Sequence, residues 1–257
     1  MTLTLNDDLC QNIRPQVWRK TTFSFFAKTG GVILNIFCKL NNSSAAKSMF
    51  EAEEEGLKAI DKTKTVKTPI VYAVNALEKG ACLLMEYVAS KNPESKDLEM
   101  FGVQLAAMHQ TSSDFYGWDN PNFIGNLLQS NHKHPNWVSF YVKERLDSQL
   151  QTAVRRGFLT KEEVPSIDKL QSVISSYCTG IKPSLLHGDL WSGNYLISEN
   201  GEPYLIDPAV YFGHSEIDLS MSRLFGGFSS SFYAAYFEKV KDCGCFGDFL
   251  KLTSDFL

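Results

Sequence analysis

The alternation of apolar and polar residues predicts a strand-rich first third of the chain with one helix in it. Apolar positions around Phe23 are followed by the turn signal Thr29-Gly30-Gly31 and then by the run VILNIFCKL, which together predict a β-hairpin. From Ser44 to Ile60 apolar residues recur at helical spacing, and Ser44 is the expected N-cap. Two further apolar runs predict strands: TPIVYAVN and ACLLMEYV.

The rest of the chain predicts helices first and a mixed region afterwards. Residues 97–177 are mostly helical by their spacing, as in DLEMFGVQLAAMHQ and WVSFYVKERLDSQL. At Leu185 the pattern changes to strand and loop, then to a hairpin with Asn200-Gly201 in its turn, and a helix is expected from about Asp218. A small β-rich, nucleotide-binding lobe at 1–88 and a larger helical lobe at 89–257 would give an α+β, two-lobed fold.

Composition and charge narrow the class of protein. The chain has 257 residues, of which 44% are hydrophobic and 21% are charged, so it can form a packed core. A net charge of −4 does not give the basic surface that non-specific binding of nucleic acid requires. The most apolar run, Val32 to Cys38, is too short to cross a bilayer, and none of the six cysteines forms a C-x-x-C pair. We therefore expect a cytoplasmic protein without a nucleic-acid or membrane partner; the sequence leaves the oligomeric state open.

The stretch LLHGDLWSGN, from Leu185 to Asn194, is the strongest candidate for chemistry. Asp189 and Asn194 lie five positions apart in a loop after a strand, and the hairpin that follows ends in Asp207. This order is the H-x-D-x-x-x-x-N…D layout of phosphotransferases. The first aspartate would accept or orient the proton of an attacking hydroxyl, while the asparagine and the second aspartate are oxygen ligands suited to Mg²⁺. The alternative is a polar loop with an Asx-turn, followed by an ordinary hairpin.

A phosphotransferase site also needs a lysine for the nucleotide phosphates, held by a glutamate on a helix. Lys39 ends an apolar strand, and Glu53 lies on the apolar stripe of the next helix, four residues from both Met49 and Leu57. Because an unpaired buried carboxylate is costly, we expect Glu53 to pair with Lys39. The alternative is that Glu53 belongs to a solvated acidic run at residues 51–55.

Two further segments are expected to support such a site. The strand CLLMEYV would lead into a hinge that offers backbone groups to adenine, unless it is an ordinary buried strand. The hinge residues would be Met85, Glu86, Tyr87 and Val88. Asp218 is expected either to hydrogen-bond to the loop around His187 and hold it rigid, or to cap its helix. His187 itself is expected to hold the loop rather than to take part in the chemistry.

These residues together resemble the fructosamine kinase family, relatives of the aminoglycoside and choline phosphotransferases within the protein-kinase-like fold. LLHGDLWSGN is similar to the signature of the family, whereas plain aminoglycoside kinases share the H-G-D-x-x-x-x-N core without the L-W-S-G filling. Three other segments resemble the glutamate helix, the lysine strand and the metal-aspartate segment of the family: MFEAE, FCKLN and IDPAVYFGHSEIDLSMSRLFGGF. The insert GWDNPNFIGN…HPNWVSFYVKERLDSQL is similar to the substrate-lobe insert of the family.

The resemblance implies ATP-dependent phosphorylation of the 3-hydroxyl of ketoamines, the ribulosamine and fructosamine adducts that sugars form on protein lysines. The phosphate destabilises the adduct, so that it leaves and the amine is repaired. By position, the resemblance implies Asp189 as the catalytic base, Asn194 and Asp207 as Mg²⁺ ligands, and Lys39 with Glu53 as the phosphate-binding pair. Trp191 would present an apolar face to the sugar, or else pack under the loop.

The chain departs from the pattern of the family in two places. The family has a glycine-rich segment before the second strand of the hairpin, whereas RPQVWRKTTFSFFAKTGG has no glycine cluster ahead of Phe23. After about Tyr236 the chain reads KVKDCGCFGDFLKLTSDFL, so we expect the larger lobe to lack its last helices. These departures keep two other hypotheses open. One is a kinase of another small alcohol, such as an aminoglycoside or a choline analogue, and the other is a kinase-like binding protein with impaired catalysis.

Overall fold

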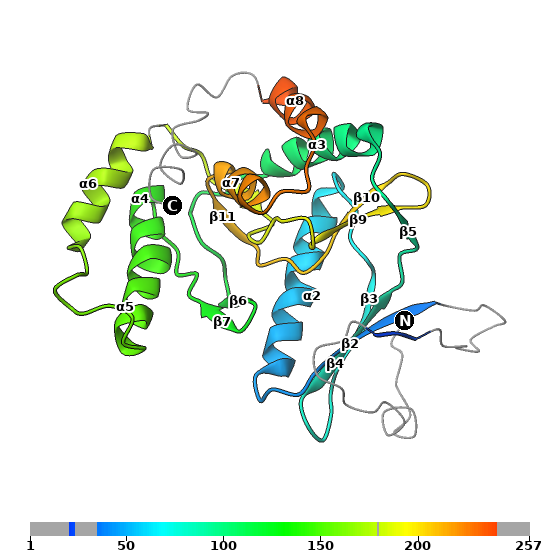
Figure 1. Ribbon diagram of the computed structural model, residues 1–257, viewed down its shortest axis with the longest axis horizontal. Coiled ribbons are helices and arrows are strands. Elements are labelled where there is room, and N and C mark those ends of the chain that lie inside the picture. The colour runs from blue at the N-terminus through cyan, green and yellow to red at the C-terminus, as the bar shows by residue number, and fades with distance from the viewer. Residues whose placement is uncertain (1–20, 24–34, 179, 241–257) are drawn as a thin grey trace.

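The computed structural model describes residues 21–23, 35–178 and 180–240, and strands and helices are segregated within them as an α+β protein requires (Figure 1). The elements are, in order, β1 (Thr21–Phe23), β2 (Ile36–Asn41), α2 (Ala46–Thr63), β3 (Val71–Ala76), β4 (Ala81–Glu86), β5 (Ser90–Lys91), α3 (Ser95–His109), β6 (Asn122–Ile124), β7 (Leu127–Gln129), α4 (Trp137–Phe140), the π-helix η1 (Tyr141–Asp147), α5 (Ser148–Arg155), α6 (Ile167–Tyr177), β8 (Ser184–Leu186), β9 (Tyr195–Ser198), β10 (Pro203–Leu205), β11 (Tyr211–Gly213), α7 (Glu216–Phe225) and α8 (Ser230–Lys239). No helix within these residues has both the length and the apolar character to span a membrane.

The first sheet is antiparallel, with strand order β1-β2-β4-β3, and helix α2 packs on one of its faces. Strand alternation places Phe37 on this face, with Leu83 and Met85 of β4, where they meet Ala46 and Phe50 of the helix. Lys39, two residues after Phe37, points to the same side. The two central strands and the strand TPIVYAVN are present as predicted, whereas the Gly30-Gly31 turn and the segment ahead of Thr21 lie outside the described residues.

Helix α2 begins two residues later than the pattern predicts, and Ser44 as its N-cap is wrong. Ala45 occupies the N-cap position without a side-chain hydrogen bond. The reason is the turn that leaves β2: the side chain of Asn41 accepts from Ser43 N, and Ala46 N donates to the Ser43 carbonyl at 3.1 Å. The first helical donor is therefore satisfied by backbone, and Ser44 remains in the turn.

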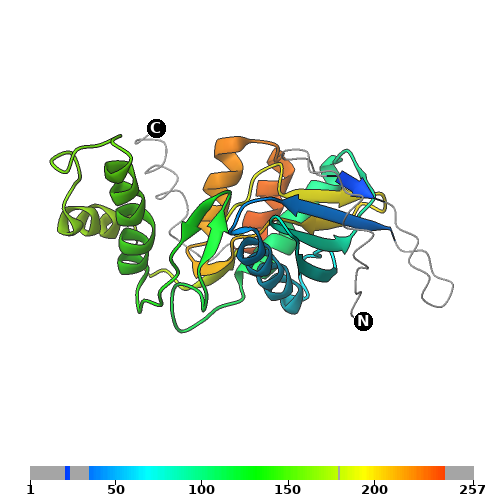
Figure 2. The same ribbon diagram turned by 90° about the horizontal axis from the view of Figure 1, so that it is seen from below.

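The region from α3 to α6 is mainly helical, but it contains a small hairpin that the periodicity did not reveal. Strands β6 and β7 pair over three residues each, and the segment before them reaches back towards α2. The long helix predicted from WVSFYVKERLDSQL is a continuous run of α4, η1 and α5, whose middle turns have π geometry. Figure 2 shows these helices and α6 at one end of the molecule, and the first sheet at the other.

The last third of the chain forms the strands β8 to β11 and the helices α7 and α8. The predicted hairpin is β9–β10, extended by β5 on its other edge, while β8 pairs with β11, a strand that the sequence did not predict. The main core lies beneath these strands and includes Phe101 of α3 together with Phe232 and Tyr236 of α8. Since β4 ends at Glu86 and β5 already belongs to the second sheet, the proposed lobe boundary at residue 88 falls between two sheets. The residues after Val240 lie outside the described part of the chain.

Candidate active site

Three charged side chains meet between the first sheet, helix α2 and the end of the β9–β10 hairpin. Lys39 on β2 donates from Nζ to Glu53 Oε1 on α2 at 2.7 Å. The same ammonium group donates to Oδ1 of Asp207, which lies 168 residues further along the chain. The side chains of Lys39, Glu53 and Asp207 are 14%, 12% and 26% exposed, so all three are largely shielded from water. The fold thus brings together the lysine–glutamate pair and the aspartate that ends the hairpin.

The electrostatics of this cluster favour an additional cation. Burial opposes the charge of Lys39, but the carboxylates of Glu53 and Asp207 outweigh it and raise the pKa of Lys39 above its usual value. Burial raises the pKa of Glu53 to about 7, although Lys39 acts in the opposite direction. When both carboxyl groups are ionised, one ammonium ion leaves net negative charge at the site, and a bound cation would favour that ionised state. Asp207 also has a φ of 56°, a left-handed conformation that is uncommon outside glycine and is often found at functional positions.

Asp189 and Asn194 contact each other within the loop at 187–194. Nδ2 of Asn194 donates to Asp189 Oδ2 at 2.9 Å and to the Asp189 carbonyl at 2.8 Å. Since both bonds use the amide nitrogen, Oδ1 of Asn194 is the atom left to face a cation. Burial is the main cause of a raised pKa at Asp189. Ile206 N donates to the Asn194 carbonyl at 3.0 Å, so this loop is joined directly to the residue before Asp207.

His187 is fully buried, and backbone groups engage both of its ring nitrogens. Nδ1 accepts from Asp189 N at 3.2 Å, which assigns the proton to Nε2, and Nε2 donates to the Ile206 carbonyl at 2.9 Å. The His187 carbonyl accepts from Ala209 N at 2.8 Å. The histidine therefore links the 187–194 loop to the segment that carries Asp207.

Asp218 holds the same loop from the other side. Its Oδ2 accepts from His187 N at 2.7 Å and its Oδ1 accepts from Gly188 N at 2.9 Å. Gly188 has a φ of 82°, and a Cβ there would lie 2.1 Å from the Ala209 carbonyl oxygen, so only glycine fits this bend. The helix expected from about Asp218 is α7, which begins two residues earlier at Glu216, because the first turn is closed by the bond from Ile217 N to the His214 carbonyl; Ser215 rather than Asp218 is its N-cap.

The sequence did not identify His109 as part of this network. Nε2 of His109, at the end of α3, lies 3.1 Å from Asp218 Oδ2, and its Nδ1 lies 2.7 Å from the Tyr236 hydroxyl of α8. These three side chains are buried and join α3, α7 and α8 beneath the loop. One signal was available: His109 follows Leu105 by four residues on the apolar stripe of its helix, where a polar side chain needs a buried partner.

The residues expected to form the hinge line one cavity together with Lys39 and Asp207. Its walls include Phe37, the segment Met85–Val88, Leu196 and Ile206, with Lys39 and Asp207 at one side. Glu86 N and Tyr87 N already donate to the carbonyls of Ile70 and Asn35, at 2.8 and 3.2 Å. Within the described part of the chain Val88 N has no such backbone bond, which leaves this donor able to face the cavity. An apolar slot with a polar end is a shape that suits a purine nucleotide.

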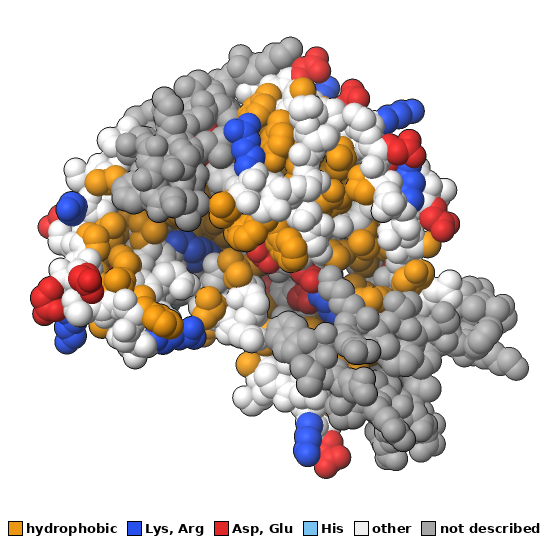
Figure 3. All heavy atoms as spheres, viewed as in Figure 1, with side chains coloured by type: hydrophobic (Ala, Val, Ile, Leu, Met, Phe, Trp, Pro, Cys, Tyr) orange, Lys and Arg blue, Asp and Glu red, His pale blue; other side chains and the backbone are white. Residues whose placement is uncertain are grey.

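Trp191 lies two residues after Asp189 and is 39% exposed. Its ring packs edge-on to Phe225, with 6.4 Å between ring centroids, and covers Gly193, where a Cβ would come within 2.4 Å of the indole. Phe225 and Leu224 are themselves more than half exposed. Hydrophobic side chains gather around α7 on the face drawn in Figure 3. The tryptophan thus partly supports the loop and partly presents an apolar surface beside Asp189.

Comparison with known proteins identifies the family to which this chain belongs. The family model for fructosamine kinase matches residues 25–242. The chain belongs to the fructosamine kinase family. A relative described as a probable ketoamine kinase, from Enterococcus faecium, is 38% identical over 192 residues, which cover 74% of this chain and 68% of the relative. The resemblance noted from LLHGDLWSGN and its companion segments is therefore confirmed.

Solved structures agree on the fold of this fructosamine kinase family member. The crystal structure of a putative fructosamine-3-kinase from Haemophilus somnus has a TM-score of 0.76 and 28% sequence identity, and covers 86% of this chain and 74% of its own. An aminoglycoside-3'-phosphotransferase of type VIII superposes with a TM-score of 0.54 at 16% identity over 98% of both chains, a likeness that concerns the fold alone. The two-lobed, protein-kinase-like α+β fold predicted from the sequence is confirmed.

Proposed function

We propose that this protein transfers the γ-phosphoryl group of ATP to the 3-hydroxyl of a ketoamine, the adduct of a sugar such as ribose or glucose with an amine. The observation that carries the proposal is the contact of Lys39 with both Glu53 and Asp207, next to the loop that pairs Asp189 with Asn194. These are the parts that phosphoryl transfer needs, namely a phosphate-binding lysine, a metal aspartate and a base. Membership of the fructosamine kinase family supplies the substrate class. Glycated protein lysines and small ketoamines are the substrates that we propose, in the cytoplasm, where ATP is supplied.

The nucleotide would lie in the cavity beneath the first sheet. Phe37 and Met85 above and Leu196 below offer apolar walls to adenine, and the Val88 N–H offers it a hydrogen-bond donor. Lys39, oriented by Glu53, would hold the phosphates at the polar side. A carboxylate–ammonium–carboxylate cluster at the end of an apolar slot matches the polarity of a nucleotide along its length.

The oxygen donors at this end fit Mg²⁺. Among the described residues no three His, Cys, Asp or Glu side chains gather into a metal cluster, and the candidate ligands are one carboxylate and one amide, Asp207 and Asn194. Mg²⁺ commonly takes one or two protein oxygens and completes its shell with phosphates and water. The ion would neutralise charge on the transferring phosphoryl group. Asp207, which contacts Lys39 here, would hold the ion, and Asn194 is oriented for this by its bonds to Asp189.

Asp189 would accept the proton of the attacking hydroxyl. Burial raises the pKa of its carboxyl, which makes the carboxylate a stronger base, and the Asn194 amide fixes its orientation. The Asp218 and His187 contacts hold the loop so that Asp189 stays in place. Once phosphorylated, the ketoamine would decompose, and the amine would be released unmodified.

The proposal is tested by measuring ATP-dependent phosphate transfer to ribulosamine-lysine and fructosamine-lysine. We expect transfer to at least one of them, with an aminoglycoside and choline as comparison acceptors. Transfer only to these acceptors would indicate a kinase of another small alcohol. Nucleotide binding would be followed in parallel, since Mg·ATP at 100 times its Kd should raise the free energy of unfolding by about 2.7 kcal/mol. Stabilisation by nucleotide without transfer to any acceptor would indicate a binding protein and contradict the proposal.

Replacing Trp191 tests the acceptor side of the site. Trp191→Ala should raise the KM for the ketoamine about 5-fold, because an aromatic contact contributes about 1 kcal/mol. Affinity for Mg·ATP should stay unchanged, since Trp191 does not line the nucleotide cavity. Trp191→Phe is the matched control, because it keeps an aromatic ring over Gly193 and should restore most of the affinity. An unchanged KM in the alanine variant would contradict the assignment.

A further inference from the structure

A second glutamate on α2 joins this helix to the segment that leads into β6. Glu55 lies two residues after Glu53, and its carboxylate accepts two hydrogen bonds from the segment that leads into β6. Trp118 Nε1 donates to Oε1 at 2.8 Å, and Asn120 Nδ2 donates to Oε2 at 3.0 Å. Each carboxylate oxygen therefore has its own donor, and bonds to a charged acceptor are about twice as strong as neutral ones.

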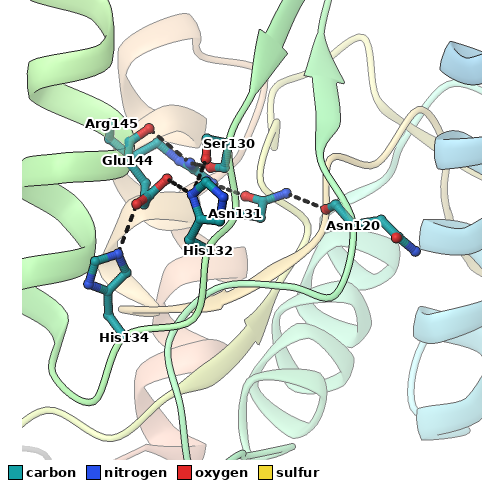
Figure 4. Close-up of polar contacts among 7 residues, drawn as sticks. All are labelled: Asn120, Ser130, Asn131, His132, His134, Glu144 and Arg145. Carbon is teal, nitrogen blue, oxygen red and sulfur yellow. Dashed lines mark hydrogen bonds and ion pairs between the residues drawn. The ribbon is translucent and has the colours of Figure 1, made fainter.

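The segment that Glu55 contacts is itself held at several points. Trp118 N donates to the Asn131 carbonyl at 2.9 Å, and the indole packs on the Phe212 ring with 5.6 Å between centroids. Asn131 Nδ2 donates to the Asn120 carbonyl at 3.0 Å, and Arg145 Nη2 donates to Asn131 Oδ1 at 2.6 Å. Figure 4 shows this chain of contacts running from Asn120 to Arg145 on the π-helix. Glu55 thus binds a segment that is braced against the helical region, rather than a loose loop.

The π-helix end of this chain is braced as well. Glu144, next to Arg145, is 9% exposed and accepts from His134 Nε2 at 2.8 Å, and its other oxygen lies 3.3 Å from His132 Nδ1 (Figure 4). The Arg145 guanidinium also stacks over the rings of Phe140 and Tyr211, 4.8 and 4.3 Å from their centroids. The series of hydrogen bonds that starts at Glu55 therefore ends at Arg145, which packs against buried rings of the helical region.

The same turn of α2 also touches the segment that carries Asp207. A Cβ at Gly56 would lie 2.9 Å from Cγ of Pro208, the residue after Asp207, so the helix packs directly against it. Within four residues, α2 therefore contacts the phosphate-binding lysine through Glu53, the insert through Glu55 and the metal-aspartate segment through Gly56. Apolar packing of Ala46 and Phe50 holds α2 against the first sheet, and the two bonds of Glu55 add a directional polar contact on the turn that also carries Glu53.

We propose that Glu55 is a positioning residue, whose two bonds to Trp118 and Asn120 fix the rotation of α2 and so set the Lys39–Glu53 pair relative to the acceptor. This role depends on the proposed function in one respect only, namely that the acceptor is a ketoamine. Trp118 and Asn120 belong to the insert that follows α3 and that resembles the substrate-lobe insert of the family, so the pair that holds the nucleotide phosphates is tied to this insert. Loss of the Glu55 contacts should therefore impair transfer without unfolding the protein.

The test compares Glu55→Gln with Glu54→Gln on the full chain. Both changes remove one negative charge from α2, but among the described residues Glu54 bonds only to Lys58, whose side chain is 61% exposed. Glu55→Gln turns one acceptor into a donor, so it faces either Trp118 or Asn120 with the wrong group. We expect a turnover about 10-fold below that of Glu54→Gln, since small misplacements of catalytic groups have effects of this size or more. We also expect weaker Mg·ATP binding and an equal urea midpoint.

Trp118→Phe supplies the second arm, because it removes the indole donor and keeps a ring against Phe212. Combined with Glu55→Gln, it should lower turnover and Mg·ATP affinity hardly further than the stronger single change, because both remove one interaction. Equal behaviour of Glu55→Gln and Glu54→Gln, or additive effects in the double variant, would overturn the inference. If the unaltered protein fails to phosphorylate any ketoamine, the proposed function fails by itself; Mg·ATP affinity and slow ATP hydrolysis then still decide the role of Glu55.

Discussion

Asp189→Asn is expected to lower the turnover of phosphate transfer by about 10²- to 10⁴-fold, the usual contribution of a general base. The change keeps the shape of the side chain, and its carbonyl oxygen can still accept from Asn194 Nδ2, which lies 2.9 Å from Asp189 Oδ2. What it removes is the carboxylate that takes the proton of the sugar hydroxyl. Because Asp189 does not line the nucleotide cavity, the Kd for Mg·ATP should stay close to that of the unaltered protein.

The two readouts of Asp189→Asn separate chemistry from binding. Turnover is measured with saturating ketoamine, and the Kd for Mg·ATP by calorimetry. Asp168→Asn, a change at an exposed position in the first turn of α6, is the matched control and should alter neither value. Turnover within a few-fold of the control would show that Asp189 is not the base.

Asp218→Asn is expected to lower the free energy of unfolding by about 3–5 kcal/mol, the range for breaking a buried charged contact. The carboxylate accepts from His187 N, Gly188 N and His109 Nε2, and it is completely buried. An asparagine must present its NH₂ group to at least one of these donors, whichever way it is oriented. A loss of this size is a large share of the total stability of a domain, about 5–15 kcal/mol.

The loss of stability caused by Asp218→Asn should also depend on pH. The burial of Asp218 would raise the pKa of its carboxyl, but the bonds from His109 and Gly188 outweigh this and hold the pKa below its usual value. A group whose pKa is lower in the folded state stabilises it fully above the unfolded-state pKa of about 3.9, and this contribution is lost as the pH falls through the folded-state pKa. The difference in urea midpoint between Asp218→Asn and Asp168→Asn should therefore be full at pH 7, still present near pH 4, and shrink as the pH falls well below about 3.9. A difference that stays equal over this pH range would contradict this reading.

Contiguous patterns predicted several parts of this protein correctly. The central strands of the first sheet, the hairpin β9–β10 and the apolar stripe of α2 follow from side-chain periodicity and an Asn-Gly turn, both of which are local. Glu53 was identified because a carboxylate on an apolar stripe needs a partner, and Lys39 contacts it at 2.7 Å. The spacing within LLHGDLWSGN placed Asp189 and Asn194 in one loop, and the structure adds that the two side chains contact each other.

Local patterns failed where long-range contacts decide the structure. Ser44 has the right chemistry for an N-cap, but the turn after β2 satisfies the first helical donor with backbone. Strand β11 has a partner only because the chain returns to β8, and the short strands β6 and β7 lack the length that makes an alternating pattern visible. The bracing beneath the 187–194 loop joins residues 109, 218 and 236, whose separation along the chain no periodicity encodes.

The sequence by itself determined which chemical groups this protein has and the order in which they occur, because strand, turn and helix signals and the H-x-D-x-x-x-x-N spacing act over a few residues. Only the tertiary structure decided how these groups meet. Asp207 contacts Lys39 across 168 residues, Asp218 in the first turn of α7 binds the backbone of the 187–194 loop, and Glu55 accepts hydrogen bonds from Trp118 and Asn120 of the insert. These contacts arise from the packing of α2, α7 and the insert against one another, and the free energy of that packing depends on surfaces that form only when the chain has folded.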